Sequence, residues 1–287
     1  VAERLHAVAD GVSRRLVSGG HQQHEEGGHL LVGERLVVDV DVVQVIGRNV
    51  KELQQFSKHS TITTDFDAIA DADVYLISVK DDAIGEVSKY LSNKKGIVAH
   101  TSGAIDMNTL QSVKKAVFYP LQTFTKDKEV DFSNIPICIE ADHEKSLNTL
   151  KSLAMSISKN VCQIDSEQRK KLHLAAVFVN NFTNYLYSIG EELCLEEGLS
   201  FDLLKPLIME TAHKIQTMSP QKAQTGPARR NDIKSMEGHL ELLNKKEHIT
   251  LYKLLSQAIK QAHEIFNQVL TACFDSAWPS NRRSGPL

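Results

Sequence analysis

The chain has 287 residues, of which 41% are hydrophobic and 24% charged, a composition typical of a folded globular protein. Its 36 acidic and 33 basic side chains give a formal net charge of −3, which excludes the basic excess that nucleic acids and anionic membranes attract. The longest strictly apolar run, Leu174 to Val179, is far shorter than the roughly 20 residues that cross a bilayer. No early segment resembles a secretion signal, so we expect a cytoplasmic protein with neither nucleic-acid nor membrane partners.

The cysteines and histidines indicate neither a disulfide framework nor a metal site. Cysteines occur at positions 138, 162, 194 and 273, without the paired spacing of a disulfide-rich or zinc-binding protein. His21 and His24 lie beside Glu25, but this spacing matches no zinc-protease motif. We therefore predict reduced thiols and no bound metal.

Residues 1–40 differ in composition from the rest of the chain. They are rich in Val, Gly, His and Arg, and the first lysine of the chain is Lys51. A change of reading frame, a fusion or an unusual natural extension would each produce such a step. The glycine pairs in this segment do not form a Gly-x-Gly-x-x-Gly motif after an apolar strand, so the usual dinucleotide fingerprint is missing.

From residue 41 onward, short apolar runs alternate with segments of helical periodicity. The run from Val74 is apolar almost throughout, as expected of a parallel strand that helices cover on both faces. In the helix after the first run, Leu53 and Phe56 form the inward pair. The alternation predicts an α/β fold with an open, mostly parallel, Rossmann-like sheet. The predicted elements are strand 41–46, helix 50–57, strand 74–79, helix 82–91, strands 97–100, 116–119 and 135–140, helix 144–158 and strand 160–164.

After Asp165 the pattern becomes entirely helical. The first helix, 170–197, is apolar over most of its circumference, which predicts that it is buried, and Gly198 is expected to end it as a left-handed cap. Further helices are predicted over 201–218, 232–245 and 248–270. The domains are therefore expected to be a Rossmann-like dinucleotide-binding domain over 1–165, with an atypical first 40 residues, an all-helical domain for substrate binding or dimerisation over 166–270, and a loosely ordered tail over 271–287.

The residues that follow the predicted strands are candidates for ligand binding, because open parallel sheets bind ligands beyond the carboxyl ends of their strands. An arginine at the end of the second strand suits the 2′-phosphate of NADP, although Arg48 could equally be an ordinary surface residue in a turn. Lys80 could likewise belong to a solvated helix start. The candidates for cofactor binding are Arg48, Asn49, Val79, Lys80, Thr101 and Ser102, and those for substrate binding include Gln122 and Thr123.

Three polar residues, His173, Asn180 and Asn184, follow one line of the long apolar helix if it has 3.6 residues per turn. Buried polar groups need hydrogen-bond partners, which either the substrate or the neighbouring backbone could supply. In the functional interpretation, this row faces the substrate, and His173 donates a proton to the oxygen or nitrogen of the carbonyl or imine that receives hydride. In the structural interpretation, the row bonds to backbone across helix crossings.

A glycine-proline loop over 224–232 concentrates hydrogen-bond donors. Gln224, Thr225 and Arg230 could anchor a substrate carboxylate there. The alternative is a structural role, in which Asp232 caps the next helix and the remaining side chains are solvated.

The motifs resemble a bacterial family of Rossmann-type oxidoreductases that join an NADP-binding domain to a helical C-terminal domain of unknown function. This family is related to pyrroline-5-carboxylate reductase and to deazaflavin-dependent NADP reductases. The resemblance covers about residues 42–268, and its motifs occur in order. They are Val74 to Asp82, His100 to Ala104, Phe118 to Phe124, His173 to Phe178 with Asn180 to Asn184, and Gln224 to Ala228 with Arg230 to Asp232.

The resemblance implies NADP as the cofactor, a homodimer formed through the helical domain, and an active site in the cleft between the domains. It gives cofactor contacts to Arg48, Val79, Lys80 and Thr101 by position. Members of the family open with a strand, a Gly-x-Gly-Asn-like loop and a helix, for which residues 1–40 show no equivalent.

The leading hypothesis is an NADP-dependent oxidoreductase that transfers hydride between the nicotinamide and a small carbonyl or imine substrate. The alternative is a catalytically silent Rossmann scaffold or ligand sensor that has lost its pyrophosphate loop.

Overall fold

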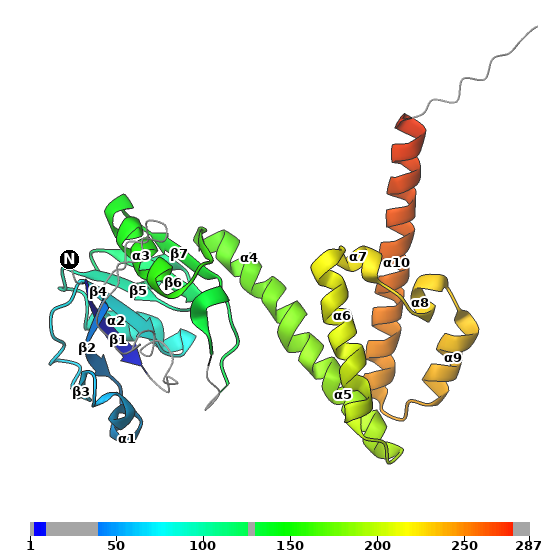
Figure 1. Cartoon of the computed structure of the whole chain (residues 1–287), viewed down its shortest axis with the longest axis horizontal. Coiled ribbons are helices and arrows are strands. Elements are labelled where there is room, and N and C mark those ends of the chain that lie inside the picture. Colours follow the sequence, from blue (N-terminus) through cyan, green and yellow to red (C-terminus); the bar gives the residue numbers. More distant parts are fainter. Residues whose placement is uncertain (1–2, 10–39, 126–129, 278–287) are drawn as a thin grey trace, which may run out of the picture. The chain divides into compact units, whose positions relative to one another are not determined.

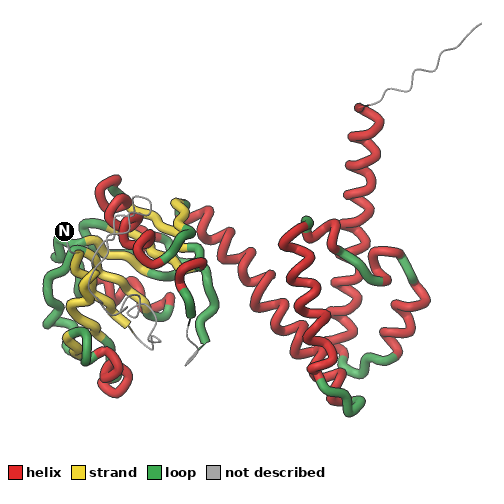
Figure 2. The backbone as a smooth tube through the Cα atoms, in the orientation of Figure 1, coloured by secondary structure: helices red, strands yellow, loops and turns green. Residues whose placement is uncertain are grey.

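The computed structural model describes the backbone of residues 3–9, 40–125 and 130–277, and the side chains of residues 40–125 and 130–265. Its contacts divide the chain into two units, Val1–Asn181 and Phe182–Leu287 (Figure 1). The first unit is a sheet with helices, and the second is helical (Figure 2). The Rossmann-like fold followed by a helical region is therefore confirmed, whereas the domain bounds read from the sequence remain a prediction.

The N-terminal unit contains an eight-stranded sheet with the order β3-β2-β1-β4-β5-β6-β7-β8. Neighbouring strands are parallel except for β6 and β7, which are antiparallel, so the predicted mostly parallel sheet is confirmed. The strands are β1 (Glu3–Ala9), β2 (Val40–Ile46), β3 (Thr61–Thr63), β4 (Val74–Ser78), β5 (Ile97–His100), β6 (Lys115–Pro120), β7 (Ile137–Ala141) and β8 (Val161–Gln163).

Strand β1 corrects the expectation that residues 1–40 hold no equivalent of an opening strand. Glu3–Ala9 lies between β2 and β4 and is parallel to both, with Val8 opposite Ile46 on one side and Ile77 on the other. The six strands from β3 to β6 thus have the 3-2-1-4-5-6 order of dinucleotide-binding folds. The segment after β1, where a phosphate-binding glycine loop would fall, and the histidines at 21 and 24 lie outside the described residues.

The sheet is apolar on both faces because helices cover both. Leu76 and Phe118 belong to a core cluster that includes residues of helix α3 (Glu144–Ile157), whereas Tyr75 and Ile77 belong to a second cluster with Ile84 of helix α2 (Ile84–Lys89). Successive residues of a strand point to opposite faces, which explains why β4 is apolar throughout. The remaining short elements of this unit are α1 (Val50–Leu53) and the 3₁₀ turns Gln54–Phe56, Asp81–Ala83, Met107–Thr109 and Phe132–Asn134.

Three segments make up the predicted helix 170–197: α4 (Ser166–Ala176), a π-helical segment (Val177–Phe182) and α5 (Thr183–Glu196). Asp165 begins α4 with a capping box, in which its side chain accepts from the backbone N–H of Gln168 and the side chain of Gln168 accepts in return. Gly198 ends α5 with φ +67°, and this left-handed cap was predicted from the sequence.

The C-terminal unit is helical throughout its described part. Helix α10 continues to Ala277, beyond the predicted end at Leu270, because no proline or glycine interrupts residues 271–277. The rest of the expected loose tail, residues 278–287, lies outside the described residues. After α5, the elements of this unit are a 3₁₀ turn (Phe201–Leu204), α6 (Lys205–Thr217), α7 (Pro220–Ala223), α8 (Pro227–Arg230), α9 (Ile233–Glu241) and α10 (Lys246–Ala277).

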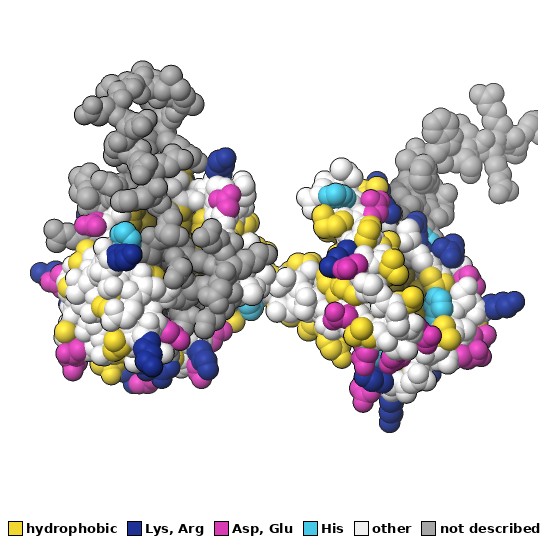
Figure 3. All heavy atoms as spheres, turned by 60° about the horizontal axis from the view of Figure 1, so that its bottom comes forward, with side chains coloured by type: hydrophobic (Ala, Val, Ile, Leu, Met, Phe, Trp, Pro, Cys, Tyr) yellow, Lys and Arg dark blue, Asp and Glu magenta, His cyan; other side chains and the backbone are white. Residues whose placement is uncertain are grey.

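Large apolar side chains of the helices are exposed in the single chain. Phe178 is 61% exposed and Val179 is 75% exposed, so the prediction that the long helix is buried is wrong for one chain by itself. In the C-terminal unit, Ala228 and His248 are the only buried residues among the described side chains. Apolar surface is visible on the helical region in Figure 3. Periodicity identified apolar positions correctly, but it carries no information about what covers them.

Candidate functional site

The carboxyl edge of the sheet brings together the candidates that follow β2, β4 and β5. These strands lie on either side of β1 and run parallel, so Arg48, Lys80 and Thr101 follow strand ends at one edge. The backbone N–H of Thr101 donates to the carbonyl oxygen of Ile77 at 3.1 Å, which ties the loop after β5 to the end of β4. Arg48 and Lys80 are exposed, and both can reach a ligand from the solvent side.

Two of the predicted cofactor residues also have structural contacts. The side chain of Asn49 caps α1 by accepting from the backbone N–H of Lys51 at 3.1 Å. Ser102 is buried, and its Oγ accepts from the backbone N–H groups of Ala104 and Ile105 at 3.1 and 3.2 Å. Val79 is half-buried in the second core cluster. These contacts hold the loops in shape, which is compatible with ligand binding through their backbone.

His100 is a buried imidazole at the end of β5. Its Nδ1 accepts from the backbone N–H of Ser102 at 3.2 Å, so the ring proton is on Nε2. Burial, and then the charge of Arg169, lower the pKa of His100 to about 4. The ring is therefore neutral near pH 7 and is enclosed in the protein, which makes it a structural group.

The structure places His173 of α4 against Tyr119, at the carboxyl end of β6. Tyr119 Oη lies 3.1 Å from His173 Nδ1, and the two rings meet edge to face with centroids 6.1 Å apart. Burial raises the pKa of the Tyr119 phenol, so the hydroxyl keeps its proton and can either donate to Nδ1 or accept from it. This contact orients the imidazole and leaves Nε2 as the nitrogen that could act on a ligand.

Gly103 lies directly against this pair and allows the close approach. A Cβ at this position would lie 2.6 Å from His173 Nδ1 and 2.7 Å from Tyr119 Cζ. Real Cβ atoms essentially never come this close to other atoms, so only glycine fits without displacing a ring. Sequence reasoning selected His173, placed Gly103 among the residues that follow a strand without giving it a role, and missed Tyr119. The position of Tyr119 near the carboxyl end of β6 was the available signal.

A buried ion pair fixes the start of α4. The Arg169 guanidinium is fully buried and donates to the Glu140 carboxylate of β7, to the carbonyl oxygen of Ile105 and, at 3.1 Å, to Ser166 Oγ. Ser166 Oγ also bonds to Glu140 and accepts from the backbone N–H of Met107 at 3.2 Å. These contacts anchor the N-terminal turn of α4 to β7 and to the loop after β5. Sequence reasoning missed this network.

The predicted polar row does not keep its expected alignment. His173, Asn180 and Asn184 would lie along one line of an ideal α-helix, but residues 177–182 form a π-helical turn. Such a turn inserts about one extra residue and rotates the later part of the helix by roughly 100° relative to a regular α-helix. Asn180 and Asn184 are exposed, whereas His173 is half-buried. The catalytic roles of the two asparagines remain predictions.

The remaining substrate candidates do not converge within one unit. Gln122 and Thr123 follow β6 and are exposed, whereas Gln224, Thr225 and Arg230 belong to the C-terminal unit. Their common contact with a substrate therefore remains a prediction.

Contacts within the 224–232 loop support its structural interpretation in part. Gln224 Nε2 donates to the carbonyl oxygen of Thr225 at 2.9 Å, and Asp232 caps α9 by accepting from the backbone N–H of Ser235 at 3.1 Å. Arg229 also donates to the carbonyl oxygen of Gln224. The capping role predicted for Asp232 is confirmed.

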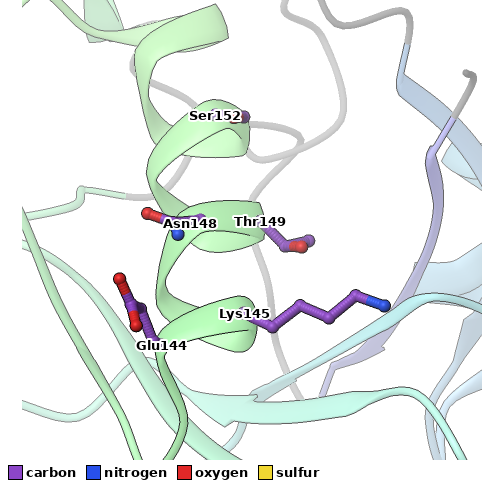
Figure 4. Close-up of a pocket in the computed structure, with 5 residues that line it drawn as sticks. All are labelled: Glu144, Lys145, Asn148, Thr149 and Ser152. Atoms are coloured by element: carbon purple, nitrogen blue, oxygen red, sulfur yellow. The ribbon is translucent and has the colours of Figure 1, made fainter.

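A surface hollow elsewhere in the N-terminal unit offers no comparable chemistry. Figure 4 shows its five described lining side chains, all from α3: Glu144, Lys145, Asn148, Thr149 and Ser152. Groups from one helix face do not converge on a ligand as groups from several strand ends do. Within the described residues, no group of three or more His, Cys, Asp or Glu side chains could hold a metal ion, and no helix is long and apolar enough to cross a bilayer.

Comparisons with known proteins agree with the fold. Residues 135–259 match the family model of a domain of unknown function, DUF2520. A crystal structure from Bacteroides fragilis, named a "putative NADP oxidoreductase", is 33% identical, with a TM-score of 0.74 and coverage of 91% of this chain and 98% of that one. A protein of Thermotoga maritima is 21% identical over 92% of this chain and 99% of its own, with a TM-score of 0.68. No curated protein matches the chain.

A more distant structure shares the fold alone. It is a reductive aminase from Aspergillus terreus in complex with NADPH and ethyl levulinate, with 12% identity, a TM-score of 0.57 and coverage of 91% of this chain and 95% of that one. The strand order and the carboxyl-edge site define a Rossmann-type protein. The 33% sequence identity between this chain and the Bacteroides fragilis protein, over 91% of this chain, is sufficient to identify the family. The chain belongs to the Rossmann-like NADP oxidoreductases with a helical C-terminal domain, as the resemblance of its motifs predicted.

Proposed function

We propose that the protein is an NADP-dependent oxidoreductase that transfers hydride between the nicotinamide and a small carbonyl or imine substrate. The observation that carries the proposal is the Tyr119–His173 pair at the carboxyl end of a strand in a 3-2-1-4-5-6 sheet. The name of the Bacteroides fragilis relative and the NADPH complex of the Aspergillus terreus structure support the choice of cofactor.

The described residues fit this cofactor at the carboxyl edge. Arg48 lies two residues after the end of β2 and is exposed, which is the position and the chemistry that a ribose 2′-phosphate requires. Asn49, Val79, Lys80, Thr101 and Ser102 would complete the contacts through side chains and loop backbone. When bound, NADPH supplies the hydride.

The chain's own contribution is a positioned proton. As an imidazolium, His173 would donate its Nδ1–H to Tyr119 Oη, and its Nε2–H would be left to pass to the oxygen or nitrogen of the substrate. After the transfer, the neutral ring remains held, because the Tyr119 hydroxyl can accept from Nδ1 or donate to it. Gln122, Thr123, Asn180, Asn184, Gln224, Thr225 and Arg230 are the proposed substrate contacts.

Titration with NADPH, followed by cofactor fluorescence and thermal stabilisation, tests the cofactor assignment. We expect Arg48→Ala to weaken NADPH binding about 10- to 100-fold, because the loss of one charge-assisted hydrogen bond changes affinity by about that factor. NADH lacks the 2′-phosphate, so its binding should change little. Lys58→Ala, which removes an exposed charge further along the chain, is the matched control. Equal losses for both cofactors would contradict a 2′-phosphate contact. A folded wild-type chain that binds neither cofactor would refute the proposed oxidoreductase activity. It would favour the alternative, a catalytically silent Rossmann scaffold or ligand sensor.

We further propose that the protein acts as a homodimer. Each amphipathic helix must bury its apolar side, yet only two described side chains of the C-terminal unit, Ala228 and His248, are buried. Leu203, Leu207 and Leu254 are each more than 60% exposed. A second copy of the same unit offers the same apolar faces and could cover them by two-fold symmetry.

Sedimentation analysis of the full chain tests the dimer. We expect the mass of two chains, and we expect Leu254→Glu to shift the protein toward the monomer by placing a charge in the interface. Lys253→Glu, at the adjacent exposed position, should leave the mass unchanged. A stably folded wild-type monomer at micromolar concentration would contradict the proposal.

A further inference from the structure

Two cysteines face each other across the edge of the sheet. Cys138 of β7 and Cys162 of β8 are register partners on neighbouring parallel strands. The Cys162 thiol donates to Cys138 Sγ, and the two sulfurs are 3.2 Å apart. Neighbouring strands lie about 4.8 Å apart, which is within the Cα separation that disulfides span, so the backbone already has suitable spacing.

The two thiols differ in their access to solvent. Cys162 is exposed, on the last strand of the sheet order, whereas Cys138 is 1% exposed. Burial, together with the neighbouring Cys162 thiol, raises the pKa of Cys138 to about 12. Cys138 therefore holds its proton and is shielded from solvent, so a dissolved oxidant meets Cys162 first.

The thiol pair lies next to the Tyr119–His173 pair. In the antiparallel register of β6 and β7, Tyr119 is opposite Cys138, so Tyr119, Cys138 and Cys162 form a row across three strands. Tyr119 and Cys138 share a core cluster against which Leu172 of α4 packs. A chemical change at the exposed end of the row would therefore reach the packing beneath Tyr119.

We propose that Cys162 is an oxidation site and that Cys138 resolves it into a reversible disulfide, with a hydroperoxide as the oxidant. The Cys162 thiol gives up its proton and its sulfur attacks one peroxide oxygen; the O–O bond breaks, and the departing oxygen takes up that proton to leave as water, or as an alcohol for an organic hydroperoxide. Cys162 then carries a sulfenic acid. The Cys138 sulfur attacks the Cys162 sulfur, the S–O bond breaks, and the hydroxide takes the Cys138 proton to leave as water. Two thiols lose two electrons, and the peroxide gains them.

Peptide mapping of the full-length protein tests this site. The reduced protein is treated with one equivalent of hydrogen peroxide, its free thiols are alkylated, and it is digested with trypsin without reduction. We expect a Cys138 peptide joined to the Asn160–Arg169 peptide, with the intact protein lighter by two hydrogen atoms per chain. Dithiothreitol should restore both alkylatable thiols.

Three variants make the result specific. Cys162→Ser, an exposed change, should abolish the linkage, and Cys194→Ser, which removes a partly exposed thiol of the C-terminal unit, should leave it intact. Cys138→Ala should leave a sulfenic acid on Cys162 that dimedone traps, and circular dichroism checks that each variant is folded. If both thiols of the wild type stay alkylatable, if Cys162 is oxidised without a link, or if another cysteine is joined, the inference is wrong.

Discussion

The buried neutral His100 should make the fold sensitive to mild acid. The unfolded chain has an ordinary histidine pKa of 6.5 at this position, whereas burial and Arg169 lower the folded value to about 4. Between these values the unfolded state binds a proton that the folded state does not bind. The free energy of unfolding therefore falls as the pH drops below 6.5, and the loss is complete near pH 4.

The size of this effect follows from the difference between the two pKa values. At roughly 1.4 kcal/mol for each pKa unit, the contribution of His100 to the loss is about 3 kcal/mol. This is a large part of the 5–15 kcal/mol that stabilises a typical domain, so mild acid between pH 6.5 and 4 should already weaken the N-terminal unit measurably. Carboxylates with lowered pKa values, such as Asp106, add losses at lower pH.

His100→Asn isolates the contribution of this ring. The Asn side-chain oxygen can take the place of Nδ1 as acceptor for the Ser102 N–H, but it does not titrate. Urea unfolding followed by circular dichroism measures the free energy of unfolding at pH 7 and at pH 4. The decrease between the two pH values should be smaller by roughly 2–3 kcal/mol in the variant than in the wild type. His143→Asn, at an exposed position, should keep the wild-type dependence. Equal pH dependence in His100→Asn and wild type would refute this account.

Three further changes test the contacts around the site. Gly103→Ala should lower the free energy of unfolding by about 1–3 kcal/mol because its Cβ overlaps two rings, whereas Gly238→Ala, in open space on a helix, should raise it by up to about 1 kcal/mol in the same urea titration. Arg169→Met should lower the free energy of unfolding by about 3–5 kcal/mol, because it leaves the Glu140 carboxylate without its cation. The double variant that adds Glu140→Gln should recover part of that loss. An Arg169→Met protein as stable as the wild type would contradict this account. Tyr119→Phe should lower kcat with unchanged NADPH affinity, and a selective loss of affinity would argue against its role in positioning the proton donor.

The sequence predicted the strands that are buried on both faces, because their apolar runs are continuous. Strands β4, β5 and β6 all occur where the runs of Val, Ile, Tyr and Phe predicted them. Strand β1 was missed because its residues lie in a segment of foreign composition, and its place in the sheet depends on pairing with two strands distant in sequence. The three residues of β3 are too few to give a pattern.

The site was predicted only where one residue stood out from its local pattern. His173 is conspicuous as an imidazole on an apolar helix, whereas Tyr119 in a strand indicates no more than β propensity. The line through His173, Asn180 and Asn184 assumed a regular helix, but residues 177–182 form a π-helical turn, which apolar periodicity does not predict. A single arginine on a helix usually indicates a solvated surface, so Arg169 gave no sign of its distant partner Glu140.

Arg169 connects the stability of the fold to the geometry of the site. A buried ion pair adds little net stability compared with apolar packing, so its main contribution here is position. Its guanidinium joins β7, through Glu140, to the loop after β5, through Ile105, and β6 with Tyr119 lies between those two strands. His173 is four residues further along α4, on the same helix face as Arg169. Arg169, whose charge adds to the effect of burial in lowering the pKa of His100, therefore fixes α4 on both sides of the strand that carries Tyr119. This holds the His173 ring at hydrogen-bond distance from the Tyr119 hydroxyl.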